Sequence, residues 1–222
     1  KALKVEDLRI DVGLNSREEV ESIGIRPGDS ITRDISFAEL GKENIVSCKS
    51  FDNRAGCTVL IELIKKIKNP DFTLFGVFTT QEEVGLRGAK TAAYGIDIDL
   101  AIIIDSTTAG PIPKTEADKV TISIGKGPSI DLMDRGFILN EKIKDIIFKA
   151  AKDASIPYQT HISGGSTDGA AVHITREGIP TAVISIPSKY IHSTVEIVDL
   201  NDLESTLKLT MKVIEIAKNN LK

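Results

Sequence analysis

The sequence predicts a three-layer α/β/α fold, in which helices cover a largely parallel β-sheet. The first observation is that continuous apolar runs bounded by charged residues recur along the chain, at residues 72–79, 99–104 and 181–186. Such runs are typical of strands that are covered on both faces. The second observation is that segments with apolar residues at helical spacing separate these runs. Strands that alternate with helices indicate a parallel sheet.

The first forty or so residues have a different texture and predict part of a small β-rich domain over residues 1–43. A strand-like stretch at residues 8–12 precedes a short helical turn, which Ser16 caps with Glu19 three residues further on. Pro27-Gly28 then predicts a tight turn before another strand. The α/β domain is expected to follow over residues 44–222.

Strands and helices are expected in alternation from about residue 44. The first long helix is expected over residues 57–68, where apolar residues recur on one face before Asn69-Pro70 ends the helix. Short strands are expected at residues 120–124 and 129–132. The remaining expected elements are a helix at 141–154, a strand at 158–162, a helix at 167–176 and a terminal helix from Asp199. That last helix carries an apolar stripe of Leu203, Leu207, Met211, Ile214 and Leu221.

Composition argues against several classes of function. The net charge of −4 and the pI of about 5.5 favour neither nucleic acid nor an anionic membrane surface. The apolar runs are too short to span a bilayer. No basic start followed by an apolar stretch marks a signal peptide. We therefore expect a cytoplasmic protein in which Cys48 and Cys57 are reduced.

Acidic residues and one histidine lie at the ends of the predicted strands. Glu82 and Glu83 follow one apolar run, Asp105 follows the next, and His192 follows the third after a short loop. Asp52 stands ahead of the first long helix. Ligands gather outside the carboxyl ends of strands in such sheets, so these five side chains are expected to meet. Oxygen and imidazole ligands without cysteine suit Zn²⁺, Co²⁺ or Mn²⁺.

The adjacent acids Glu82 and Glu83 suggest a division of roles. If the backbone is extended there, the two neighbouring side chains diverge and cannot both bind one ion. One can bind metal while the other faces the water that the metal activates, as metal-assisted amide hydrolysis requires. The residues alone leave a second interpretation open, in which this is a solvated acidic loop that caps the following helix.

Five segments of the chain carry a family resemblance: SFDNRAGC, TTQEEVGLRGA, AIIIDST, GGSTDGAAVH and PSKYIHSTVEI. Together they resemble the family of glutamyl aminopeptidases and tetrahedral, TET-type aminopeptidases, some members of which have been labelled cellulase M or endoglucanase. The likeness runs in the family's order from about Val5 to the C-terminus.

The resemblance implies a metal-dependent aminopeptidase with a zinc-exopeptidase-like catalytic domain and two divalent metal ions, Zn or Co. It implies that Asp52 bridges the ions, that Glu83, Asp105 and His192 are further ligands, and that Glu82 is the catalytic base. Relatives cleave N-terminal residues from peptides and form dimers to dodecamers, so peptide substrates and a homo-oligomer are expected. Residues 1–43 would belong to the family's inserted dimerisation domain. The resemblance leaves the preferred N-terminal residue open.

The chain departs from the family at one ligand. The family's first histidine ligand stands in a His-x-Asp motif ahead of the inserted domain, yet no histidine precedes Asp52 here. Because the sequence starts at Lys1, we expect that the segment with this histidine lies outside it. The alternative is a non-catalytic family member with an incomplete metal site.

Four further residues are candidates for contacts with substrate. Gly165, Thr167 and Asp168 lie in a glycine-rich loop that the resemblance places near the active site. They are expected to bind substrate or to support the site, although Thr167 or Asp168 could simply cap the next helix. Asn53 and Arg54 are expected to orient Asp52 or to cap its helix, and Arg54 could also meet a substrate carboxylate.

Two other histidines are expected to be structural rather than metal-binding. His161 lies within a predicted strand, and His173 lies in the middle of a predicted helix between apolar neighbours. Neither follows a strand, which is where the other candidate ligands stand.

A glycoside hydrolase is the remaining alternative. It would need two carboxylates about 5 to 9.5 Å apart across a sugar-binding cleft. The adjacent Glu82 and Glu83 are poorly placed for that geometry. With no Trp and only 5% aromatic residues, the chain also offers little on which sugar rings could stack.

Overall fold

The computed structural model describes residues 4–116 and 119–220, and the chain divides into two compact units, Lys1–Asp34 and Ile35–Lys222. The first unit contains the 3-10 turn η1 (Val5–Asp7) and the helix α1 (Arg17–Ser22). The predicted capping box is confirmed, because the Glu19 amide donates to Ser16 Oγ at 3.2 Å and the Glu19 carboxylate accepts from the Ser16 amide at 3.3 Å.

The strand expected at residues 8–12 is wrong. None of the described residues before Ile35 forms a strand, and alternate side chains such as Leu8 and Ile10 are more than half exposed. An alternating pattern becomes a strand only when a neighbouring strand completes its hydrogen bonds, and no strand pairs with this stretch among the described residues. The expected dimerisation role of residues 1–43 stays a prediction.

The second unit contains two sheets. A small antiparallel sheet joins β1 (Ala38–Glu39), β2 (Ile45–Cys48) and β7 (Glu196–Asp199). The main sheet has the order β3-β6-β4-β5, formed by β3 (Ala101–Thr108), β6 (Thr181–Ser188), β4 (Ser129–Met133) and β5 (Gln159–Ile162). β3 is parallel to β6 and β4 is parallel to β5, but β4 runs antiparallel to β6. The sheet is therefore mixed.

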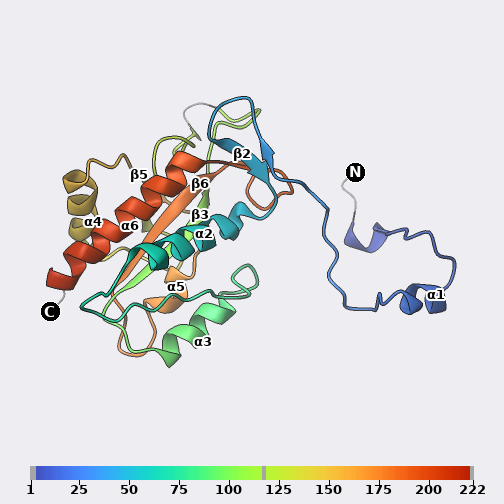
Figure 1. Cartoon of the computed structure of the whole chain (residues 1–222), viewed down its shortest axis with the longest axis horizontal. Helices are drawn as coiled ribbons and strands as arrows, with labels where there is room; N and C mark the ends of the chain where they lie inside the picture. Colours follow the sequence, from blue (N-terminus) through green and yellow to red (C-terminus); the bar gives the residue numbers. More distant parts are fainter. Residues whose placement is uncertain (1–3, 117–118, 221–222) are drawn as a thin grey trace. The chain divides into compact units, whose positions relative to one another are not determined.

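Helices cover both faces of the main sheet, as predicted (Figure 1). They are α2 (Phe51–Lys66), α3 (Arg87–Gly95), α4 (Glu141–Asp153), α5 (Gly169–Val172) and α6 (Leu200–Asn220). Ile104 of β3 packs in the cluster built by α2 and α6, whereas its neighbour Ile103 packs against α3 and α5. Consecutive strand residues point to opposite faces, so these helix pairs form the two outer layers. α4 packs beside α6.

Two expected strands are absent from the described residues. Residues 72–79 form no strand, and Phe75 and Phe78 are about half exposed, at 47% and 49%. This run passes along α2, where Gly76 approaches the side chain of Ile64, and no ladder partner lies beside it in the described part of the chain. Residues 120–124 contribute only an isolated bridge between Ser123 and Gly110.

Two helices differ in extent from their predictions. α2 begins at Phe51 rather than at residue 57, although its first turn is kinked at Asp52 and Asn53. α5 has 4 residues instead of the expected ten. The backbone there closes three-residue turns, such as Thr175 N to Val172 O at 3.0 Å, in place of a continuing α-helical ladder. Leu221 of the predicted apolar stripe lies outside the described residues.

None of the helices in the described part of the chain is long and apolar enough to cross a membrane.

Candidate metal centre

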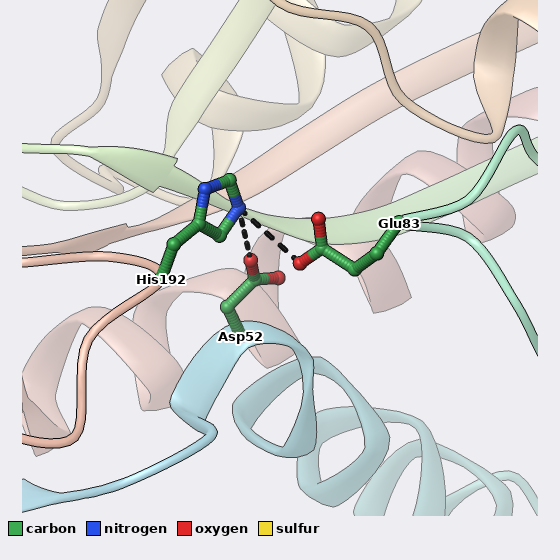
Figure 2. Close-up of side chains that lie close together, drawn as sticks. All are labelled: Asp52, Glu83 and His192. Atoms are coloured by element: carbon green, nitrogen blue, oxygen red, sulfur yellow. Dashed lines mark ion pairs between the residues drawn. The ribbon is translucent and has the colours of Figure 1, made fainter. Parts of the chain in front are cut away.

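Three of the five predicted site residues form a compact group of potential metal ligands. Asp52 comes from the first turn of α2, Glu83 from the loop before α3, and His192 from the loop between β6 and β7 (Figure 2). His192 Nε2 lies 3.0 Å from Asp52 Oδ2 and 3.2 Å from Glu83 Oε1. One ligand atom from each residue lies within 4.8 Å of the other two. Three elements far apart in sequence thus bring two carboxylates and an imidazole together.

The first turn of α2 holds Asp52 against the main sheet. Its backbone leaves the helical range at Asp52 and Asn53, and the peptide bond between them is cis. Asn53 Nδ2 donates to the Ile104 carbonyl oxygen of β3 at 2.7 Å, and Asn53 Oδ1 accepts from the Gly56 amide at 3.0 Å. A Cβ at Gly56 would lie 2.8 Å from the Ile104 carbonyl oxygen, so this close approach of α2 to β3 needs a glycine.

Glu196 is a functional candidate that the sequence analysis did not single out. Its side chain is only 2% exposed, at the start of β7. Glu196 Oε2 accepts from the Asp52 amide at 2.9 Å, and Oε1 accepts from the His192 amide at 3.1 Å. One buried carboxylate therefore fixes the backbones of two ligands. Its sequence signal is an acid that opens a short apolar strand four residues after His192.

Three residues in the group or next to it have left-handed backbone. Ser50 has a φ of 62°, Gln81 of 59° and His192 of 62°. A non-glycine residue in this region costs on the order of 1 kcal/mol or more, and such strain concentrates at functional sites. Here it turns the chain sharply beside Asp52 and Glu82 and at His192 itself.

The electrostatics of the group fit a bound cation. Burial, followed by the hydrogen bond and the charge of Glu83, raises the pKa of Asp52 to about 7, while the charge of His192 acts in the opposite direction. Acids held this close favour protonation unless positive charge joins them. A divalent ion would supply that charge, and the donor set of carboxylate oxygens and imidazole nitrogen is one that Zn²⁺ and similar ions accept.

Asp105 lies near the group but outside it. It stands within β3 rather than after it, is 7% exposed, and its Oδ1 accepts from the Ser106 amide at 2.8 Å. Burial raises its pKa well above the usual range, and the charges of Asp52, Glu82 and Asp168 add to this effect. Asp105 therefore feels the charges of the site, while its role as a ligand stays a prediction.

Glu82 is half-buried beside the group and has the properties of a proton acceptor. Burial, then the charges of Glu83 and Asp168, raise the pKa of Glu82 to about 7. A carboxyl group with such a pKa can both take and release a proton near neutral pH.

The glycine-rich loop lies near Glu82, since the charge of its Asp168 contributes to the raised pKa of Glu82. Thr167 and Asp168 are buried, and the Gly165 carbonyl oxygen accepts from the Arg135 amide at 3.0 Å. Arg54 is exposed on α2, and its amide donates to Ser50 at 3.2 Å. The proposed contacts of these four candidate residues with substrate stay predictions.

His161 and His173 lie outside the ligand group. His161 Nδ1 is 3.2 Å from Thr107 Oγ1 and 3.7 Å from Asp131 Oδ1. His173 Nδ1 is 2.9 Å from the Gly169 carbonyl oxygen, and its ring meets Phe137 edge-on at 5.5 Å. These contacts agree with the structural roles expected for both.

Known proteins resemble this chain over nearly all its length. A putative aminopeptidase of Acetivibrio thermocellus is 39% identical over 96% of this chain and 64% of its own length. The crystal structure of a TET aminopeptidase from Thaumarchaeota archaeon SCGC AB-539-E09 superposes with a TM-score of 0.90 at 35% identity, over 99% of this chain and 64% of that chain. The TET1 peptidase of Pyrococcus horikoshii gives a TM-score of 0.77 at 34% identity, over 91% of this chain and 59% of that chain.

This chain therefore spans roughly three fifths of the length of these relatives, from 59% to 64%. The family model described as M42 glutamyl aminopeptidase matches residues 1–209. Since that match takes in most of the chain and all the residues of the ligand group, the chain belongs to the M42 glutamyl aminopeptidase family.

Proposed function

We propose that this protein is a metal-dependent aminopeptidase, which removes N-terminal residues from peptides with a dinuclear metal centre and Glu82 as general base. The observation that carries the proposal is the meeting of Asp52, Glu83 and His192 beside Glu82. Membership in a family of aminopeptidases supports the reaction class. The ligand group supports the dependence on metal.

In this proposal, Asp52 would serve both ions, and Glu83, Asp105 and His192 would complete the donors that this chain supplies. Divalent ions bound there, Zn or Co, would polarise a peptide carbonyl group and lower the pKa of water to about 7. The buried Glu196 keeps the Asp52 and His192 backbones in place, so the two ligands are held together before any ion binds.

Glu82 is the residue that moves protons. It takes a proton from the attacking water and delivers it to the amine that leaves when the peptide bond breaks. Its raised pKa suits both halves of this transfer, because the group is neither a strong acid nor a strong base near neutral pH. Glu83 cannot share the task while it binds metal.

The test is release of free amino acid from a panel of aminoacyl-p-nitroanilides by the full-length protein. The protein is stripped with EDTA and assayed before and after Co²⁺ or Zn²⁺ is restored. We expect activity only with metal, and none on the same substrates carrying an N-acetyl group, because an aminopeptidase needs the free amine. Cleavage of acetylated substrates, or equal rates with and without metal, would contradict the proposal.

The proposal includes self-association. The TET1 peptidase of Pyrococcus horikoshii can assemble into a tetrahedron or a large octahedral shell. We expect this protein to form a homo-oligomer too, and its mass in solution, measured by light scattering, tests the expectation. A monomer at micromolar concentration would contradict it and leave the catalytic proposal standing.

A further inference from the structure

A buried carboxylate in the glycine-rich loop is bound to the segment that carries Glu82. Asp168 is 7% exposed, and its Oδ2 accepts from Thr79 Oγ1 at 2.6 Å. Its other oxygen, Oδ1, is buried and has no hydrogen-bond partner among the described residues. Thr79 stands three residues before Glu82. The hydrogen bond from Thr79 therefore stabilises a carboxylate that is otherwise costly to bury.

Hydrogen bonds to the turn after β4 hold the loop that carries Asp168 in place. Asp134, which is 6% exposed, accepts from the Thr167 amide at 3.1 Å and from Thr167 Oγ1 at 3.4 Å. The Arg135 amide donates to the Gly165 carbonyl oxygen at 3.0 Å. The turn after β4 therefore fastens the loop at two places just before Asp168.

A second set of contacts holds the two residues that follow Thr79. The Thr80 carbonyl oxygen accepts from the Gly88 amide at 2.9 Å, and the Gln81 carbonyl oxygen accepts from the Arg87 amide at 3.3 Å. A Cβ at Gly88 would lie 2.5 Å from Thr80 N and O, so only glycine permits this approach. The start of α3 and Asp168 together fix the backbone that leads into Glu82.

The two sets of contacts belong to one packed unit. Alanines of α3 and residues of α5, which begins directly after Asp168, share one apolar cluster: Ala89, Ala93, Ala171 and Val172. The carboxylate of Asp168 also lies close enough to Glu82 and Asp105 that its charge raises the pKa of both. Its contact with Thr79 therefore bears on the geometry of the proton-transfer residue.

We infer that Asp168 is a positioning residue for Glu82, which acts through its hydrogen bond with Thr79. This inference rests on the proposed function, because it gives the bond a catalytic purpose. It assigns Asp168 the supporting role rather than direct contact with substrate. Losing the bond should displace Glu82 and lower kcat, while KM and metal content stay the same.

The experiment is a double-mutant cycle in the metal-loaded, full-length protein. Thr79→Val keeps the shape of the side chain and removes the donor, Thr79→Ser keeps the donor, and Asp168→Ala removes the acceptor. Small displacements of a catalytic group cost up to about a hundredfold in rate, so we expect kcat to fall at least roughly tenfold in Thr79→Val and in Asp168→Ala. Thr79→Ser should recover most of the rate. The double variant should be no slower than Asp168→Ala alone, since both changes break one bond.

A second readout separates the inference from the proposed function. Hydrogen exchange of the amides in residues 80–83 should accelerate in Thr79→Val but not in Thr79→Ser. Thr73→Val, a change of an exposed threonine in the same run, is the matched control and should alter neither readout. If wild type is active and Thr79→Val keeps its kcat, or if the two single effects multiply, the inference is overturned alone. If wild type releases no amino acid with metal restored, the proposed function fails, and the positioning role fails with it.

Discussion

At the residue scale, Glu196 shows how this site is held together without a metal ion. Each of its carboxylate oxygens accepts one hydrogen bond, from the backbone amide of Asp52 or of His192, and the side chain is almost fully buried. Hydrogen bonds from backbone amides to a buried carboxylate are strong. Groups that orient metal ligands matter almost as much to affinity as the ligands themselves.

Glu196→Gln is expected to weaken metal binding without removing any ligand. The amide side chain keeps one acceptor oxygen, but its NH₂ group faces one of the two backbone amides, which then loses its partner. We expect metal affinity to fall roughly 10- to 100-fold in a calorimetric titration. Glu177→Gln, on the exposed turn after α5, is the control and should leave the affinity unchanged. An unaltered affinity in Glu196→Gln would remove Glu196 from the site.

Metal affinity is expected to depend steeply on pH around neutrality. The pKa of Asp52 is raised to about 7, so in the metal-free protein protons compete with metal for this carboxylate below that pH. We expect the affinity for Co²⁺ to rise roughly tenfold per pH unit between about pH 5.5 and 7 and to level off above it. Titrations in buffers of different ionisation enthalpy should show proton release at pH 6. Affinity that is independent of pH in this window would contradict the raised pKa.

At the element scale, the kinked first turn of α2 positions Asp52 in the site. The carboxylate of Asp52 leaves the helix at the kink, and Asn53 ties the same turn to the Ile104 carbonyl oxygen of β3. The interface is tight there, since a Cβ at Gly56 would meet Asn53 Oδ1 at 2.3 Å and the Ile104 oxygen at 2.8 Å. A glycine inside a helix is therefore kept for packing.

Gly56→Ala is expected to lower the free energy of unfolding by about 1–3 kcal/mol, because the added methyl group overpacks the α2–β3 contact. Helix propensity alone predicts the opposite sign, a gain of about 1 kcal/mol. Gly95→Ala in α3 is the matched control, since its Cβ would meet nothing within 4 Å. Denaturant unfolding of both variants measures the two values. A more stable Gly56→Ala variant would show that the contact can relax.

Some secondary-structure elements could be predicted from the sequence and others could not. Strong apolar runs with covered faces, such as β3 and β6, were predictable because their burial dictates their composition. Residues 72–79 have the same composition, yet they form no strand, because strand formation also needs a neighbour that no local pattern reveals. The cap of α1 was predictable from Ser16 and Glu19, since a capping box is local chemistry.

At the scale of the whole molecule, the carboxylate of Asp202 ties α6 to the turn ahead of β4. It accepts from the Gly125 amide at 2.6 Å and from the Gly127 amide at 2.8 Å, and it is 1% exposed. Burial raises the pKa of Asp202 to about 6, although both amides act against the shift. α6, the longest helix in the described part of the chain, is thus joined to the sheet through a group that titrates in folded protein at mildly acidic pH.

This shift gives the sign of a stability change with pH. The folded-state pKa of Asp202 lies above its unfolded value of 3.8, so the native state binds more protons between about pH 4 and 6. Its contribution to stability is therefore present below about pH 4 and is lost as pH rises to 6. Relative to Asp202→Asn, wild type should lose on the order of 2 kcal/mol of unfolding free energy over this range. Parallel pH profiles of the two proteins in urea unfolding would contradict the shift.

The site was predictable to the extent that topology gathers residues at strand ends. That rule brought Asp52, Glu83 and His192 together correctly. It could not show that Asp105 stands within β3 rather than after it, because strand ends are the least certain part of such a prediction. The same rule did not point to Glu196, because the role of Glu196 depends on two backbone amides whose positions only the folded chain defines.

The measurement that tests the central claim most directly is the turnover of Glu82→Gln at measured metal content. Glutamine keeps the size of the side chain but cannot accept and pass on a proton. We expect metal binding like that of wild type and a fall in kcat of at least roughly 100- to 10,000-fold on the best aminoacyl-p-nitroanilide. Turnover close to that of wild type in a variant with full metal content would contradict the assignment of Glu82 as general base, and with it the mechanism proposed for this site.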